Sequence, residues 1–170
     1  MEGDRKILFA PWRMKYVEYV AIEPKRGCFL CEAARSKDDE KNFVLCRSDN
    51  ALVMLNLFPY NTGHLLIAPY RHVGDVLLLS KEECTDLINL LRVSLVALRK
   101  VYSPDGFNIG VNIGSISGAG LEDHVHIHVV PRWKGDTNFM PIIANTKVIP
   151  EALEDTYRKL IKLFSKEKFS

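Results

Sequence analysis

One stretch in the second half of the chain alternates histidine with β-branched residues. Residues 123–131 read Asp-His-Val-His-Ile-His-Val-Val-Pro and contain three of the five histidines. A pattern with period two is typical of a β-strand, where every second side chain points to the same face. It predicts one face of imidazoles, roughly 6–7 Å apart, and one apolar face that packs in a core. The imidazoles are those of His124, His126 and His128, and the apolar side chains are those of Val125, Ile127 and Val129.

Composition narrows the class of protein. A chain of 170 residues with 47% hydrophobic and 26% charged residues predicts a single globular domain over residues 1–170. A net charge of +2 gives no reason to expect a nucleic acid or a membrane surface as partner. No apolar run approaches the roughly 18 residues of a membrane span, and the charged N-terminus lacks an apolar signal core. We therefore expect a cytoplasmic protein.

Short apolar segments separated by turn residues predict the strands of a sheet. The Asp49-Asn50 pair between two of them is typical of a hairpin turn, so these neighbouring strands are expected to run antiparallel. The predicted strands cover residues 43–46, 51–55, 64–68, 107–112 and 124–130.

Two longer segments show the helical spacing of apolar residues. The first opens at residues 80–83, Ser-Lys-Glu-Glu, a capping box, and ends at Ser103-Pro104. The second covers about residues 150–165, and a short helix is expected between Cys28 and Arg35. Strands, one long helix, further strands and one C-terminal helix predict an α+β fold with a mainly antiparallel sheet.

The histidine strand indicates a functional site. A strand with histidine along one whole face cannot bury apolar side chains on that face, and the fold alone rarely requires this. Two chemistries are open from the residues alone. The histidines can hold a catalytic zinc ion, since Zn²⁺ binds neutral imidazole. Alternatively, one imidazole can attack phosphorus while its neighbours neutralise the phosphate oxygens. The loop over residues 114–120 is rich in glycine and offers backbone N–H groups to an anion.

The chain has four cysteines. A disulfide framework is not expected in an intracellular chain of this size. Cys28 and Cys31 form a C-x-x-C motif, which is either half of a metal site or a redox pair. Cys46 and Cys84 are expected to be small buried side chains.

Residues 124–130, His-Val-His-Ile-His-Val-Val, resemble the signature of the histidine-triad (HIT) superfamily of nucleotide hydrolases and transferases. Residues 56–69 look like the nucleotide-binding segment of that family. Residues 12–16 and 131–140 are similar to its diadenosine tetraphosphate phosphorylase-like branch. The resemblance implies a histidine-triad fold, a homodimer and an enzyme that acts on a nucleotide substrate.

The resemblance also implies roles for single residues. His126 would be the nucleophile that attacks the α-phosphorus and carries a nucleotidyl group, oriented by His124 or a backbone carbonyl. His128 would contact phosphate oxygens together with His64. The loop before the strand lacks the Gln-Ser or Gln-Thr pair common in the family, so backbone donors are expected there. The implied nucleotide- and phosphate-binding residues are Asn56, His64, Asn112, Gly118 and Gly120.

A structural zinc ion is the one cofactor that the resemblance implies, and no organic cofactor is expected. Its ligands would be two sulfur and two nitrogen atoms in a tetrahedral arrangement. They would come from Cys28, Cys31, His72 and His124.

The implied reaction is cleavage of a dinucleoside polyphosphate such as diadenosine tetraphosphate, with inorganic phosphate favoured over water as the acceptor. Three alternatives remain. One is hydrolysis of the same substrate or of a nucleoside phosphoramidate. Another is a zinc-dependent hydrolase that uses all three strand histidines as ligands. The third is a nucleotide-sensing binding module with little turnover.

Overall fold

The computed structural model describes residues 27–118, 120–136 and 148–165 of the chain. The chain divides into two compact units, residues 1–26 with 135–148, and residues 27–134 with 149–170. The first unit lies almost wholly outside the described residues, as do residues 12–16 and 137–140 of the sequence resemblance. The architecture below is that of the second unit, and the single domain over residues 1–170 stays a prediction.

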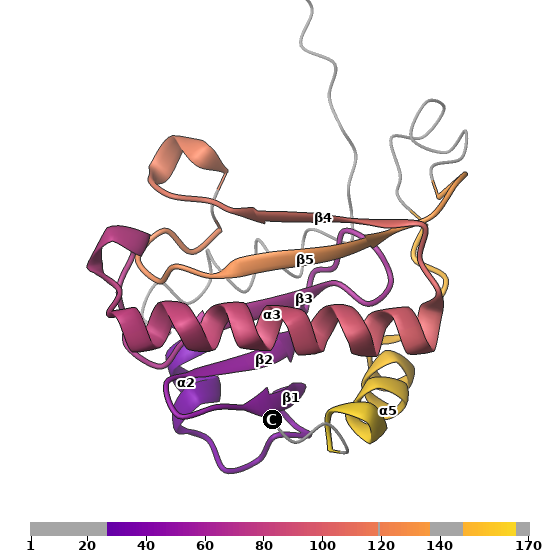
Figure 1. Ribbon diagram of the computed structural model, residues 1–170, viewed down its shortest axis with the longest axis horizontal. Helices are drawn as coiled ribbons and strands as arrows, with labels where there is room; N and C mark the ends of the chain where they lie inside the picture. Colours follow the sequence, from indigo (N-terminus) through magenta and orange to yellow (C-terminus); the bar gives the residue numbers. More distant parts are fainter. Residues whose placement is uncertain (1–26, 119, 137–147, 166–170) are drawn as a thin grey trace, which may run out of the picture. The chain divides into compact units, whose positions relative to one another are not determined.

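The sheet of the second unit has five antiparallel strands in the order β1-β2-β3-β5-β4 (Figure 1). β5 is therefore an inner strand that pairs with β3 on one side and with β4 on the other. This arrangement confirms the mainly antiparallel sheet and the hairpin of the first two strands. The bounds are β1 Val44–Arg47, β2 Ala51–Leu55, β3 Leu65–Pro69, β4 Gly106–Val111 and β5 Ile127–Arg132.

Helices pack on both faces of this sheet. The capping box predicted at Ser80 is present, with the Ser80 and Glu83 side chains each bonded to the other's backbone N–H. The expectation that Cys84 is buried was wrong, because that residue lies on the solvent side of this helix. The helices are α2 Phe29–Arg35, α3 Lys81–Tyr102 and α5 Leu153–Phe164, with 3-10 turns η1 Val76–Leu78 and η2 Ser115–Ser117.

Alternate residues of the inner strands enter two different cores. One core lies between the sheet and α3 with α5, and the other lies between the sheet and α2. β2 and β3 are buried along their whole length because both of their faces are covered. The first core includes Val53, Leu55, Leu65, Ile67 and Val129, and the second includes Leu52, Met54, Leu66 and Ala68.

The histidine strand starts later than predicted. β5 begins at Ile127, and its register pairs His128 with Leu66 of β3 and Gly110 of β4. Val125 instead donates its backbone N–H to the carbonyl of Val73, at 2.6 Å. Residues 124–126 thus leave the sheet because they bind the loop after β3.

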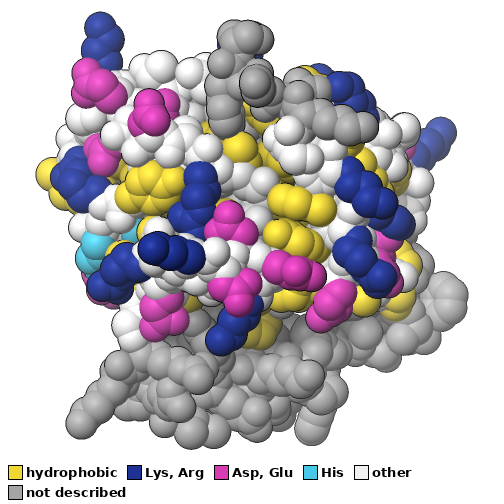
Figure 2. Space-filling model, turned by 90° about the horizontal axis from the view of Figure 1, so that it is seen from below, with side chains coloured by type: hydrophobic (Ala, Val, Ile, Leu, Met, Phe, Trp, Pro, Cys, Tyr) yellow, Lys and Arg dark blue, Asp and Glu magenta, His cyan; other side chains and the backbone are white. Residues whose placement is uncertain are grey.

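None of the described helices is long and apolar enough to cross a membrane. On the face shown in Figure 2, basic and acidic side chains are both spread over the surface, so neither positive nor negative charge predominates there. The cytoplasmic location and the absence of nucleic-acid and membrane partners stay predictions.

Candidate functional site

The five histidines of the chain fall into two neighbouring groups. In the first group, the ring centroids of His126 and His128 are 4.8 Å apart, and those of His64 and His128 are 5.2 Å apart. In the second group, the rings of His72 and His124 lie 5.1 Å apart. His124 and His126 are only two residues apart in the sequence, yet they belong to different groups. We call the first group the imidazole cluster.

The proton position on His64 follows from its donors. The backbone N–H of Tyr60 points at Nδ1 of His64 at 3.0 Å, and the side-chain amide of Asn56 lies 3.2 Å from the same atom. A nitrogen that accepts hydrogen bonds carries no proton, so a neutral His64 has its proton on Nε2. Nε2 lies 3.0 Å from Nδ1 of His128 and donates to it. His128 must then carry its own proton on Nε2.

His126 has the opposite tautomer. Its Nδ1 lies 2.8 Å from the backbone carbonyl oxygen of His124, which can only accept a hydrogen bond. The ring therefore donates from Nδ1, and Nε2 keeps a free lone pair. The imidazole cluster consequently offers a nucleophilic nitrogen on His126 beside an N–H donor on His128.

Burial keeps these rings neutral. Burial and the neighbouring imidazoles lower the pKa of His64 to about 3. Burial, together with His126, lowers the pKa of His128 to about 4. Burial also lowers the pKa of His126 below its ordinary value. At neutral pH the two tautomers described above are thus the relevant forms.

This burial predicts a pH dependence of stability. Between pH 6.5 and about 4, His64 and His128 become protonated in the unfolded chain but stay neutral in the folded chain. The free energy of unfolding therefore falls as pH falls. Between pH 7 and pH 5, the free energy of unfolding of His64→Gln should fall by up to about 2 kcal/mol less than that of the wild-type chain. Urea unfolding at the two pH values measures this difference. Equal losses in both proteins would contradict the burial of a neutral His64.

The second group adds two cysteines to two histidines. Cys28, Cys31, His72 and His124 each offer one ligand atom, and these atoms all lie within 4.8 Å of one another. Sγ of Cys28 is 3.2 Å from Nδ1 of His124, and Sγ of Cys31 is 3.3 Å from Nδ1 of His72. Ligands of a tetrahedral ion with bonds of about 2.0–2.3 Å lie about 3.5 Å apart. The four residues therefore fit a metal ion, and we call them the Cys/His cluster.

His124 is oriented for this cluster by the backbone. The ring is fully buried, and its Nε2–H donates to the carbonyl of Pro69 at 2.8 Å. Nδ1 therefore has no proton and faces the cysteines, an arrangement commonly found in metal-binding histidines. Burial raises the pKa of the Cys28 thiol to about 11, so a bound cation would be needed to hold it as thiolate.

The loops that carry His72 and His124 touch at a glycine. A Cβ on Gly74 would lie 2.7 Å from the carbonyl oxygen of Glu122 and 3.3 Å from Cα of Asp123. Both contacts are to backbone, so a larger residue would force the two loops apart.

Gly74→Ala is accordingly expected to lower the free energy of unfolding by about 1–3 kcal/mol and to weaken metal binding. Gly106→Ala is the matched control, because a Cβ there would meet nothing within 4 Å. Urea unfolding and a metal titration compare the two variants. Equal effects of both substitutions would show that the contact at Gly74 is not needed.

Other predicted site residues lie near the imidazole cluster or in the loop before it. Asn56 is half-buried, and its side chain binds His64 and the backbone N–H of Phe58. Asn112 directly follows β4, whose last residue, Val111, pairs with Ile127 of β5. Gly118 and Gly120 are exposed on either side of residue 119, which lies outside the described residues. Their contacts with a nucleotide stay predictions.

Tyr60 was not among the site residues predicted from the sequence. Its ring stacks on that of His64 at 4.9 Å and lies 6.0 Å from that of His128. An aromatic residue among Pro, Asn, Thr and Gly in a loop was the available signal. The carbonyl of Pro69 had no signal in the sequence, because every residue carries such a group.

The alternative of one ion shared by all three strand histidines does not match this geometry. Nδ1 of His124 faces the cysteines and Nε2 binds Pro69, so neither nitrogen of that ring faces the imidazole cluster. The residues are better described as two adjoining sites.

The sequence of this chain is similar to those of several known proteins. A protein from Mycobacterium tuberculosis (strain ATCC 25618 / H37Rv) named AP-4-A phosphorylase is 37% identical over 158 residues, 90% of this chain and 81% of that protein. An asymmetrical bis(5'-nucleosyl)-tetraphosphatase of Schizosaccharomyces pombe is 36% identical over 93 residues, 55% of this chain and 50% of that protein.

A solved structure shows the same fold. It is that of a Zn-bound histidine triad family protein from Mycobacterium smegmatis, with a TM-score of 0.64 and 24% identity over 82% of this chain and 94% of that chain. The model of the HIT domain family matches residues 37–135, which include both groups of histidines. The chain belongs to the HIT domain family.

Proposed function

We propose that this chain is an enzyme that cleaves dinucleoside polyphosphates, such as diadenosine tetraphosphate, through a nucleotidyl-His126 intermediate. The observation that carries the proposal is the free Nε2 of His126 beside the Nε2–H of His128. Nucleophilic attack by one group and hydrogen-bond donation by the other are the two functions that phosphoryl transfer needs.

The first step forms a bond between Nε2 of His126 and the α-phosphorus. The bond from phosphorus to the bridging oxygen breaks, and its electron pair leaves with the nucleoside polyphosphate. The Nε2–H of His128 donates to an oxygen on which negative charge develops. The carbonyl of His124 accepts from Nδ1 of His126 and stabilises the positive charge that the ring gains.

The second step regenerates the enzyme. An oxygen of inorganic phosphate attacks the α-phosphorus, and the N–P bond breaks with its electron pair returning to His126. From diadenosine tetraphosphate the products would be ATP in the first step and ADP in the second. Phosphate is favoured as the acceptor because the relative named AP-4-A phosphorylase aligns over 90% of this chain, whereas the tetraphosphatase aligns over 55%.

Incubation with diadenosine tetraphosphate, with and without inorganic phosphate, tests this function. ADP plus ATP, formed only with phosphate, supports phosphorolysis. AMP plus ATP, formed without phosphate, would show that the reaction is hydrolysis rather than phosphorolysis. Tight AMP binding without any product would support a binding module and contradict the proposal. Turnover of adenosine phosphoramidate alone would point to the phosphoramidate alternative.

We also propose that the Cys/His cluster holds a zinc ion. Two thiols and two imidazoles are ligands that zinc prefers, and the similar structure from M. smegmatis is that of a Zn-bound protein, which supports the choice. A bound ion would tie Cys28 and Cys31 to the two histidines and so stabilise the fold. Four protein ligands complete a tetrahedron, which is typical of a structural site rather than a catalytic one.

We further propose a homodimer formed through β4. This strand is at the edge of the described sheet, and exposed edge strands readily pair with another chain. Apolar side chains continue from the edge into the following loop. Ile109 is 47% exposed, Val111 36% and Ile113 41%.

Ile109→Lys is expected to convert the dimer into a monomer, because it places a charge in the apolar edge. Ile88→Lys is the matched control, since Ile88 is 54% exposed on α3, a helix that packs on β2 and β3. Size-exclusion chromatography with light scattering gives the mass of each protein. A monomeric wild-type chain, or an Ile109→Lys dimer, would contradict this interface.

A further inference from the structure

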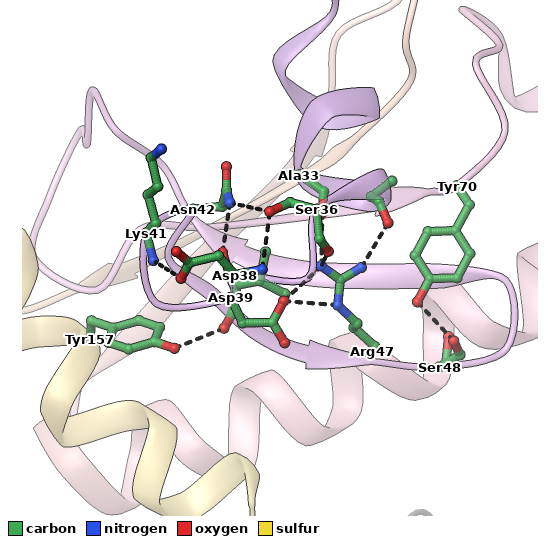
Figure 3. A network of polar contacts seen from close by, with 12 residues as sticks. Ala33, Ser36, Asp38, Asp39, Lys41, Asn42, Arg47, Ser48, Tyr70 and Tyr157 are labelled. Atoms are coloured by element: carbon green, nitrogen blue, oxygen red, sulfur yellow. Dashed lines mark hydrogen bonds and ion pairs between the residues drawn. The ribbon is translucent and has the colours of Figure 1, made fainter.

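Arg47, the last residue of β1, directs its guanidinium at the C-terminal end of α2 (Figure 3). Nη1 donates to the carbonyl of Ala34 at 3.0 Å. Nη2 donates to the carbonyl of Ala33 at 2.8 Å and to that of Ser36 at 3.1 Å. One side chain thus satisfies three carbonyls where the helix ends.

These carbonyls have no partner inside the helix. The last four C=O groups of any α-helix lack intrahelical donors, and a cation beside them also interacts favourably with the helix dipole. α2 has only 7 residues and is too short to be stable by itself. Its position therefore depends on tertiary contacts, namely the buried Leu30 and Ala33 and the Arg47 guanidinium.

Asp39 holds the guanidinium from the other side. Its Oδ1 accepts from Nε of Arg47 at 3.0 Å and from Nη2 at 2.7 Å (Figure 3). The Arg47 side chain is only 26% exposed. A lysine at this position would keep the charge but lose the planar fork that reaches several acceptors at once.

The opposite end of α2 carries both thiols of the Cys/His cluster. Cys28 is the N-cap residue, and Cys31 lies in the first turn. His72 and His124 come from outside the helix, so the docking of α2 sets the separation between the thiols and the imidazoles. Arg47 lines the same pocket of about 620 Å³ as Cys28, Cys31 and His72.

We propose that Arg47 is a positioning residue of the Cys/His cluster, which acts by keeping α2 docked in the metal-free protein. The proposal rests on the zinc site proposed above. A site that is assembled only part of the time binds more weakly in proportion to that fraction. Loss of the guanidinium contacts would lower the assembled fraction while leaving all four ligands in place.

Arg47→Lys tests this inference. The zinc affinity, measured by competition with a chromophoric chelator, should fall by about tenfold to a hundredfold, the range expected for lost hydrogen bonds to a charged group. Hydrogen exchange should show that the amides of residues 29–35 lose protection in the metal-free variant and recover it with zinc. Asp39→Asn should weaken zinc binding in the same direction and by less, because the guanidinium keeps its carbonyl contacts.

Tyr157→Phe is the matched control, since it removes a hydrogen bond from α5 to the carbonyl of Val44 in β1 and leaves α2 untouched. It should lower stability without changing the zinc affinity. If Arg47→Lys binds zinc as tightly as the wild-type chain, Arg47 is only a structural residue and the inference is wrong. If the wild-type chain itself takes up no zinc, the proposed zinc site is wrong, and the inference about Arg47 is then wrong as well.

Discussion

Replacing His126 with asparagine is expected to abolish turnover of diadenosine tetraphosphate and to remove the covalent nucleotidyl adduct. An asparagine amide can keep a hydrogen bond to the His124 carbonyl, but it has no lone pair on nitrogen that attacks phosphorus. Loss of a nucleophile that works in concert with its neighbours lowers the rate by on the order of 10⁴-fold or more. Steady-state rates and mass spectrometry of the protein, quenched in alkali because phosphoramidates are labile in acid, measure both effects.

His128→Asn provides the comparison within the same site. It should slow the reaction, because an oxygen of the substrate loses its donor, yet the adduct on His126 should still form. Both variants should keep the wild-type melting temperature to within a few degrees. Full turnover by His126→Asn would show that another residue or water attacks phosphorus directly.

Removing the proposed zinc ion should have the largest effect on stability. An ion present at about 1,000 times its dissociation constant stabilises the folded chain by about 4 kcal/mol. In a chain of this length each kcal/mol shifts the melting temperature by about 2–4 °C. Chelation, or Cys31→Ser, is therefore expected to lower the melting temperature by about 8–16 °C. Scanning fluorimetry and metal analysis by mass spectrometry measure the shift and the bound zinc.

Cys84→Ser is the control for this experiment, because Cys84 is exposed on α3 and outside the Cys/His cluster. It should keep the zinc and the melting temperature of the wild-type chain. Added zinc should restore the chelated wild-type chain and leave Cys31→Ser unchanged. A Cys31→Ser protein with stoichiometric zinc and unaltered melting would contradict the proposed ligand set.

His124 connects the two sites. Its ring belongs to the Cys/His cluster, and its backbone carbonyl accepts the hydrogen bond that orients His126. A shift of the backbone at residue 124 would therefore displace both the ring in the Cys/His cluster and the acceptor of His126. The resemblance assigned this orienting role to His124 or a backbone carbonyl, and the structure identifies the acceptor as the carbonyl of His124 itself.

The periodicity of apolar residues was sufficient to predict most elements of the fold. β2 has the predicted bounds, and the capping box at Ser80 starts α3 as expected. The histidine segment shows the limit, because Val125 binds the loop at Val73 rather than a neighbouring strand. A hydrogen bond between residues about 50 positions apart leaves no local pattern in the sequence, because the backbone N–H of almost any residue can form one.

By itself, the sequence determined the residue types and their spacing: histidines two apart, a C-x-x-C motif and a family signature. Only the tertiary structure decided which nitrogen carries the proton in His64, His124, His126 and His128, and which histidine joins which site. It also placed Arg47 at the end of α2 and Tyr60 on the imidazole cluster. The physical reason is that these properties depend on hydrogen bonds to backbone groups that are chemically identical in every residue. Packing alone brings a particular carbonyl or N–H to a particular side chain.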